Sequence, residues 1–197
     1  MVTDPIGIAL RVAEALEACG IRYLVGGSLA SSISGEPRSS MDIDIVVELP
    51  TSKVPSLVAT LSAEFHADLD RLRSAVERKS SANILHKATS TKIDLFVAGG
   101  TAIDEEQMNR RLRLRVGSNP DRYLYIYTPE DIVLQKLRWF RMGNEVSDRQ
   151  WRDILGIVRT QGQRLDEAWL RRGATILRVS DLLERALKQG GGLAGGD

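Results

Sequence analysis

The sequence predicts an α/β (α+β) fold, in which helices flank a small mixed sheet and a helical subdomain follows. Through residue 127, short strand-like apolar runs alternate with helical patterns, and from residue 128 the pattern is helical throughout. No internal repeat interrupts this order. We therefore expect an α/β domain over residues 1–127, a helical subdomain over 128–188 packed on it, and a disordered Gly-rich tail over 189–197.

Helix and strand signals alternate in the first part of the chain. Asp4 followed by Pro5 is typical of a helix start, because proline lacks the N–H group that the first turn leaves unpaired. Further helices are expected over residues 29–34, 53–65, 70–79 and 103–111. Strands are expected over residues 21–25, 41–49, 83–89, 92–97, 112–116 and 122–127, with 83–89 and 92–97 forming a hairpin.

The second part begins with a clear helix signal. Thr128 precedes a proline and, three residues on, a carboxylate, which is typical of a capped helix start, and this helix should end near Met142. Ser147 and Asp166 are expected to cap two further helices, and residues 179–187 supply one more apolar face. Three tryptophans fall at apolar helical positions and are predicted to lie in the core: Trp139, Trp151 and Trp169.

Composition limits the classes of function. The net charge is +1, so no overall field indicates nucleic acid or a membrane as a partner. Cys19 is the single cysteine, which excludes an intramolecular disulfide and a cysteine zinc site. No apolar run approaches the roughly 18 residues that a membrane helix needs. The first residues lack the basic flank of a signal peptide, so a cytoplasmic location is expected.

A glycine turn followed by two carboxylates marks the candidate site. Gly26, Gly27 and Ser28 end the first apolar run and precede a short helix. Backbone N–H groups at such a turn can approach a phosphate closely, and the helix dipole favours the anion. Asp42 and Asp44 lie two residues apart on a strand and so share one face. The stretch predicts a site for a nucleoside triphosphate bound with Mg²⁺.

A third acid, Asp94, lies in the apolar strand 92–97. A carboxylate there is costly to bury unless it is paired or binds a metal. One alternative is a partly exposed residue paired with Lys92 or Lys87. The earlier carboxylates can likewise face solvent on an edge strand, and the glycines can form a simple turn. The joint occurrence of these features is much rarer by chance, which favours one shared site.

These residues resemble the nucleotidyltransferase superfamily typified by DNA polymerase beta, whose pattern is a G-[GS] turn, a D-x-[DE] pair and a third acid on a later strand. The closer resemblance is to the AbiEii/AbiGii toxin type, in which G-G is followed by R-x-T-x-D-x-D. Residues 38–44 read R-S-S-M-D-I-D, with Ser40 where threonine is usual. An I-D-[IL] strand matches residues 93–95, a helix ending in lysine matches 128–136, and an aspartate in the next helix matches Asp153.

The resemblance covers about residues 20–160 and implies a two-metal nucleotidyl transfer. Asp42 and Asp44 would bridge two Mg²⁺ ions, and Asp94 would hold the metal near the acceptor hydroxyl and help to deprotonate it. The Gly-Gly-Ser turn would hold the β- and γ-phosphates. Pyrophosphate would leave after in-line displacement at the α-phosphate. The site is expected in the cleft between the two parts of the chain.

Three further residues have a candidate role in the site. Arg38 is expected to contact the triphosphate, the alternative being a loop arginine in solvent or paired with Glu36. Lys136 either reaches the nucleotide as a point charge or extends along an apolar face into solvent. Asp153 follows Arg149 by four residues, so a surface ion pair is the alternative to a site role.

Two histidines and a basic cluster are further candidates for metal or RNA binding. His66 and His86 show no metal-ligand spacing. A cluster of arginines is expected to form a solvent-exposed face, and the alternative is that it binds the phosphates of an acceptor RNA. Its members are Arg110, Arg111, Arg113 and Arg115, of which the last three would share a strand face.

The predicted function is Mg²⁺-dependent transfer of NMP from an NTP such as ATP to a hydroxyl group. The acceptor is an RNA such as tRNA, a protein or a small molecule. The AbiEii resemblance implies a toxin of a toxin–antitoxin or phage-defence system, with a cognate antitoxin as partner. Two alternatives stay open: a nucleotide-binding or interaction module without transfer activity, and an antibiotic-type, small-molecule nucleotidyltransferase. An acidic acceptor pocket would indicate an aminoglycoside, and a basic one would indicate RNA.

Overall fold

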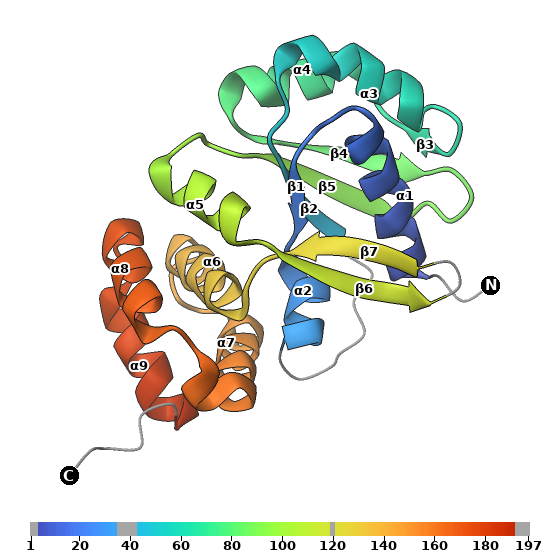
Figure 1. Cartoon of the computed structure of the whole chain (residues 1–197). Helices are drawn as coiled ribbons and strands as arrows, with labels where there is room; N and C mark the ends of the chain where they lie inside the picture. Colours follow the sequence, from blue (N-terminus) through green and yellow to red (C-terminus); the bar gives the residue numbers. More distant parts are fainter. Residues whose placement is uncertain (1–3, 35–42, 119–120, 192–197) are drawn as a thin grey trace. The chain divides into compact units, whose positions relative to one another are not determined.

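The computed structural model describes residues 4–34, 43–118 and 121–191. The chain divides into two compact units, one formed by Met1–Leu29 and Ser40–Ile126 and the other by Ala30–Ser39 and Tyr127–Asp197. The first unit contains a mixed seven-stranded sheet with helices, and the described elements of the second are helical (Figure 1). The predicted α/β class is confirmed.

The sheet mixes parallel and antiparallel pairs. Its strands are β1 (Tyr23–Val25), β2 (Ile43–Val47), β3 (Phe65–His66), β4 (Ser81–His86), β5 (Lys92–Val97), β6 (Leu112–Ser118) and β7 (Asp121–Ile126). Their order is β3-β4-β5-β2-β1-β7-β6. The β2–β5 and β1–β7 pairs are parallel, and the other neighbours are antiparallel, including the predicted β4–β5 hairpin. Two strands distant in sequence, β2 and β5, are therefore direct neighbours.

Helices of the first part alternate with the strands along the chain. They are α1 (Pro5–Ala18), α2 (Gly27–Ser34), η1 (Thr51–Lys53), α3 (Val54–Leu61), α4 (Leu69–Arg78) and α5 (Ala102–Arg110). Asp4 accepts a hydrogen bond from the backbone N–H of Gly7, as expected of a helix cap. The helix predicted over 53–65 is wrong at its end. It stops at Leu61, and Phe65 pairs with His86 as part of β3, because pairing with a strand edge outweighs local helix propensity.

One face of the sheet is packed into the core of the first unit. In β2 and β5 the buried residues alternate with half-buried ones, as strand geometry requires. The buried set consists of Ile43, Ile45, Val47, Ile93, Leu95 and Val97, and it joins one hydrophobic cluster with residues of α1, α3 and α4. Asp44 and Asp94 alternate with this set and so lie on the opposite face of the sheet.

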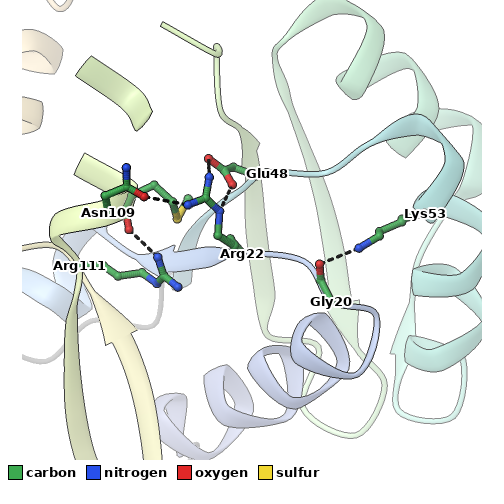
Figure 2. A network of polar contacts seen from close by, with 7 residues as sticks. Gly20, Arg22, Glu48, Lys53, Asn109 and Arg111 are labelled. Carbon is green, nitrogen blue, oxygen red and sulfur yellow. Dashed lines mark hydrogen bonds and ion pairs between the residues drawn. The ribbon is translucent and has the colours of Figure 1, made fainter. Parts of the chain in front are cut away.

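A polar network ties β1 to its neighbours. The guanidinium of Arg22, just before β1, donates two hydrogen bonds to the Glu48 carboxylate and one, of 2.8 Å, to Asn109 Oδ1 on α5 (Figure 2). Nearby, Arg111 donates to the Met108 carbonyl and Lys53 to the Gly20 carbonyl. Because one guanidinium bonds groups next to β2 and on α5, it holds these elements in register with β1.

From Tyr127 on, the described elements of the second unit are helices. They are α6 (Pro129–Met142), α7 (Asp148–Gln161), η2 (Gly162–Arg164), α8 (Glu167–Leu177) and α9 (Ser180–Gly190). The predicted caps Thr128, Ser147 and Asp166 each accept a backbone N–H hydrogen bond. The Trp169 indole N–H donates to Asp131, which is fully buried, at 2.8 Å. A buried carboxylate is thereby satisfied where α6 meets α8.

The prediction that all three tryptophans lie in the core is wrong for Trp139. Trp139 is 47% exposed, whereas Trp151 and Trp169 are buried. The buried face of α6 passes through the neighbouring positions 137 and 140, which turns position 139 outward.

The helix α9 also extends further than expected. Gln189, predicted to begin the tail, lies in α9 and accepts a hydrogen bond of 2.8 Å from the Trp151 indole. Gly190 is helical as well and lies against Val158, so close that a Cβ there would stand 2.4 Å from a methyl carbon. Both residues are held by packing that the Gly-rich composition does not reveal, whereas residues 192–197 lie outside the described part.

No helix in the described part of the chain is long and apolar enough to span a bilayer.

Tyr23 provides a test of packing in the first unit. Burial, reinforced by the Glu17 carboxylate to which the phenol donates at 3.1 Å, raises the pKa of Tyr23 above its usual value. The unfolded chain therefore loses this proton first as pH rises above about 10, and stability falls there. We predict that Tyr23→Phe flattens the alkaline decline of the unfolding free energy, measured by urea titration from pH 9 to 11. Parallel declines in variant and wild type would contradict this.

Candidate functional site

Two of the predicted acids lie side by side in the sheet. Asp44 on β2 and Asp94 on β5 are register partners in a parallel pair, so their side chains project from neighbouring positions of one face. Neighbouring strands are about 4.8 Å apart, which allows both carboxylates to bind one cation. Asn83 on β4 is the register partner of Asp94 on its other side. The row Asp44, Asp94 and Asn83 thus crosses three adjacent strands.

The glycine turn closes on Asp44. The helix α2 begins at Gly27, as expected for a phosphate-binding turn at a helix N-terminus. Gly27 has φ +58°, and a Cβ added there would lie 1.7 Å from Asp44 Oδ2. The Gly26 N–H donates to the Asp44 carbonyl at 2.9 Å, and Ser28 is half-buried in the first turn of α2. Only glycine leaves room for the carboxylate, so the turn and the acid form one structural element.

Asp94 has a basic neighbour on its own strand. Lys92 Nζ lies 2.7 Å from Asp94 Oδ2, and the carboxylate side chain is 23% exposed. The sequence offered this ion pair as an alternative to metal binding, and the structure contains it. Because the pair uses Oδ2, a cation would coordinate Oδ1 or displace the ammonium group. The Lys92 contact therefore does not exclude a metal role for Asp94.

Carboxylate oxygens are the donors that Mg²⁺ prefers. Asp44 and Asp94 supply two such groups on one face, and the missing side chain of Gly27 leaves the Asp44 carboxylate its space. Among the described residues, no group of three or more acidic, histidine or cysteine side chains gathers at a point. Asp42 and Arg38 lie outside the described residues. The donor chemistry of the acids that are placed fits Mg²⁺.

The other two candidate residues meet each other in the second unit. Lys136 on α6 and Asp153 on α7 form an ion pair of 2.8 Å, with side chains 12% and 11% exposed. Lys136 is thus a partner of Asp153 and lies largely buried. The sequence had offered Arg149 as the partner and an extended, solvent-reaching lysine. This nearly buried ion pair joins α6 to α7 and holds the Lys136 ammonium group against Asp153.

The basic cluster stacks on aromatic rings. The guanidinium of Arg113 lies 3.7 Å from the ring centre of Tyr123, and that of Arg111 lies 4.6 Å from the centre of Tyr125. Arg115 pairs with Asp121 at 3.0 Å. Cation–π contacts thus occupy Arg111 and Arg113, and an ion pair occupies Arg115. Arg111 precedes β6, so the expectation that it shares a strand face with the other two is not met.

A groove next to Asp94 is not predicted by the sequence. It has a volume of about 450 Å³ and lies between α4 and β4. Arg71, Ser74 and Arg78 of α4 line it together with Asn83 and Asp94. The available signal was the spacing of three and seven residues along α4, which places these polar side chains on one side of the helix. The spacing alone does not indicate a binding site, because only the folded sheet brings Asp94 next to these α4 residues.

No family model and no curated protein matches this sequence. Solved structures of similar fold include an antigenic nucleotidyltransferase-like protein from Paracoccidioides brasiliensis, at TM-score 0.53 and 16% identity, covering 92% of this chain and 91% of that one. Another is ANT(2″)-Ia in complex with adenylyl-2″-tobramycin, at TM-score 0.54 and 12% identity, covering 89% and 98%. At such identities the likeness concerns the fold. The chain therefore has a nucleotidyltransferase-type fold, while the AbiEii/AbiGii resemblance stays a prediction.

Gly27→Ala tests the contact between the turn and Asp44. The added methyl group must displace the carboxylate, so we expect weaker Mn²⁺ binding in calorimetry and a loss of stability beyond the roughly 1–2 kcal/mol of backbone strain. Gly100→Ala is the matched control, because Gly100 also has positive φ but has nothing within 4 Å of the added Cβ. Equal effects of both substitutions would show that the Asp44 contact has no importance.

The Lys136–Asp153 pair predicts a pattern in a double-mutant cycle. Removing either partner leaves a charge nearly buried, so Lys136→Met or Asp153→Leu should each cost about 3–5 kcal/mol in urea unfolding, and the double variant should recover most of this. Arg141→Met, which breaks the exposed pair with Asp181, should cost less than about 1 kcal/mol. Single variants no worse than Arg141→Met would exclude a structural role for the buried pair.

Proposed function

We propose that this protein is a Mg²⁺-dependent nucleotidyltransferase that moves NMP from an NTP to a hydroxyl group of an acceptor. The observation that carries the proposal is the pairing of Asp44 with Asp94 across β2 and β5, with the Gly27 turn closed on Asp44. These elements lie in a fold shared with a structure described as nucleotidyltransferase-like and with ANT(2″)-Ia in complex with adenylyl-2″-tobramycin. A carboxylate pair beside an anion-binding turn suits a triphosphate carried with its cation.

The residues would divide the work as follows. Asp44 and Asp94, together with Asp42, would hold two Mg²⁺ ions. The ions would neutralise phosphate charge and lower the pKa of the attacking hydroxyl. Backbone N–H groups of Gly27 and Ser28, at the start of α2, would donate to the β- and γ-phosphates and orient the α-phosphate for in-line attack.

Asp94 has the position expected of the residue on the acceptor side. It lies between Asp44, which is next to the phosphate-binding turn, and Asn83, which is further from it. A hydroxyl approaching from the Asn83 side would meet the Asp94 carboxylate before the α-phosphate. Asp94 would orient this hydroxyl by accepting its hydrogen bond and would take its proton.

The alternative of a binding module without transfer activity is less well supported. A module that only binds nucleotide needs the turn and one acid, whereas this chain also keeps Asp94 on the neighbouring strand, in register with Asp44. A toxin role with an antitoxin partner rests on the sequence resemblance alone, and the assay of activity does not depend on it.

The assay is transfer of label from each of the four α-³²P NTPs, with Mg²⁺, to total RNA and to lysate protein. We predict that Asp44→Asn and Asp94→Asn each lower the rate by about a hundredfold or more. Asp181→Asn, which changes an aspartate on the surface of α9, should keep the wild-type rate. Wild-type rates in the Asp44 or Asp94 variant would contradict the site. No label on any acceptor with any NTP would favour the binding module.

A further inference from the structure

The groove beside Asp94, which we call the α4 groove, has a mostly polar lining. Arg71, Ser74 and Arg78 of α4 line it. Asn83 of β4 and Asp94 of β5 also line the groove. Its volume of about 450 Å³ suits a nucleotide-sized ligand. The groove belongs wholly to the first unit, which also contains Asp44.

Arg71 has no evident stabilising role in α4, whereas Arg78 lies in the last turn, where a cation interacts favourably with the helix dipole. Arg71 lies in the first turn of α4, directly after the acidic Asp70, and its backbone N–H is bonded by the cap Asp68. A cation in the first turn of a helix interacts unfavourably with the helix dipole, so the charge of Arg71 does not stabilise α4. Arg78, two turns later on the same side, donates a hydrogen bond to Ser74 Oγ. Arg71, Ser74 and Arg78 lie on one side of α4 and line the groove together.

Across the residues that the structure describes, neither Arg71 nor Arg78 is paired with a carboxylate. Asp70, which also lines the groove, lies 3.8 Å from Arg73 instead. The remaining carboxylate, Asp94, is paired with Lys92 and would be further neutralised by a metal ion. The two guanidinium groups therefore leave the groove with a positive field, which favours an anion and disfavours a polycation.

The sheet register connects this field to the acids. The row Asp44, Asp94 and Asn83 leads from the phosphate-binding turn to β4, which forms one wall of the groove. Successive strands are about 4.8 Å apart, so a ligand in the groove can present a hydroxyl to Asp94 while another of its groups lies against α4. A phosphate is the group that a pair of guanidiniums best accepts.

We propose that the α4 groove is the acceptor subsite, and that it takes an acceptor with a phosphate close to its reacting hydroxyl, as in a ribonucleotide end. The proposal rests on the transfer function assigned to Asp94. Arg71 and Arg78 bind the phosphate and set specificity, and Asn83 donates to the sugar edge. An amino sugar with several ammonium groups meets repulsion at the same place, which argues against the aminoglycoside-type acceptor.

The test is direct binding in the absence of NTP. The probe is a fluorescein-labelled RNA tetranucleotide with a free 3′ hydroxyl, followed by anisotropy at several salt concentrations. The double variant Arg71→Ala/Arg78→Ala should weaken binding at least about tenfold. The slope of log affinity against log salt should fall by about 0.7 for each arginine. Arg73→Ala is the matched control, since Arg73 is an exposed arginine of α4 outside the groove lining and should leave both values unchanged.

Competition distinguishes the source of the phosphate. Displacement of the RNA by AMP at similar concentration would show a small phosphorylated acceptor, and resistance to AMP would show an RNA end; both support the groove as a phosphate site. Equal affinity in the double variant and in Arg73→Ala, or binding of tobramycin in preference to RNA, would overturn the inference. If the wild type binds RNA but shows no transfer, the proposed function fails while the ligand class of the groove stands.

Discussion

The close approach of the Gly27 backbone to the Asp44 carboxylate is the contact on which the candidate site depends. It requires a residue without a side chain at the start of α2, with φ +58°, because a Cβ would fall 1.7 Å from Oδ2. It also requires β1 and β2 to pair in a fixed register, which the hydrogen bond from Gly26 N–H to the Asp44 carbonyl extends by one step. One contact thereby fixes the anion-binding turn relative to the first acid.

The rest of the site follows from the alternation of strand faces. Ile43 and Ile45 fix β2 on the core, and Ile93 and Leu95 do the same for β5, so the acids between them must lie on the other face. A slip of one residue in either strand would bury the carboxylates and expose the isoleucines. The hydrophobic cluster therefore maintains the Asp44–Asp94 pairing, although it contains no functional group. The Arg22 network adds polar restraints near the ends of β1 and β2.

Local sequence patterns predicted those features that depend on neighbouring residues. Caps such as Thr128 and Ser147 and the shared face of the β5 residues follow from chemistry within a few positions. The strand at Phe65, the exposure of Trp139 and the helical state of Gln189 depend on distant partners, and local patterns gave the wrong result for each.

The candidate site shows the same division. The sequence indicated that Asp44 and Asp94 each lie on an outward face, but only the parallel register of β2 with β5 makes them neighbours. The meeting of Lys136 with Asp153, and of Arg71 with the Asp94 side of the sheet, likewise requires tertiary structure. Motif resemblance selected the acids as a set to be tested, whereas it contained no information on the groove beside them.

The most direct measurement is a crystal structure with Mn²⁺ and a non-hydrolysable NTP, using the anomalous signal of manganese to place the ion. The account predicts a manganese peak about 2.0–2.2 Å from carboxylate oxygens of both Asp44 and Asp94, with the phosphates at the N-terminus of α2. A manganese–nucleotide complex bound elsewhere, or a peak that touches neither aspartate, would contradict it.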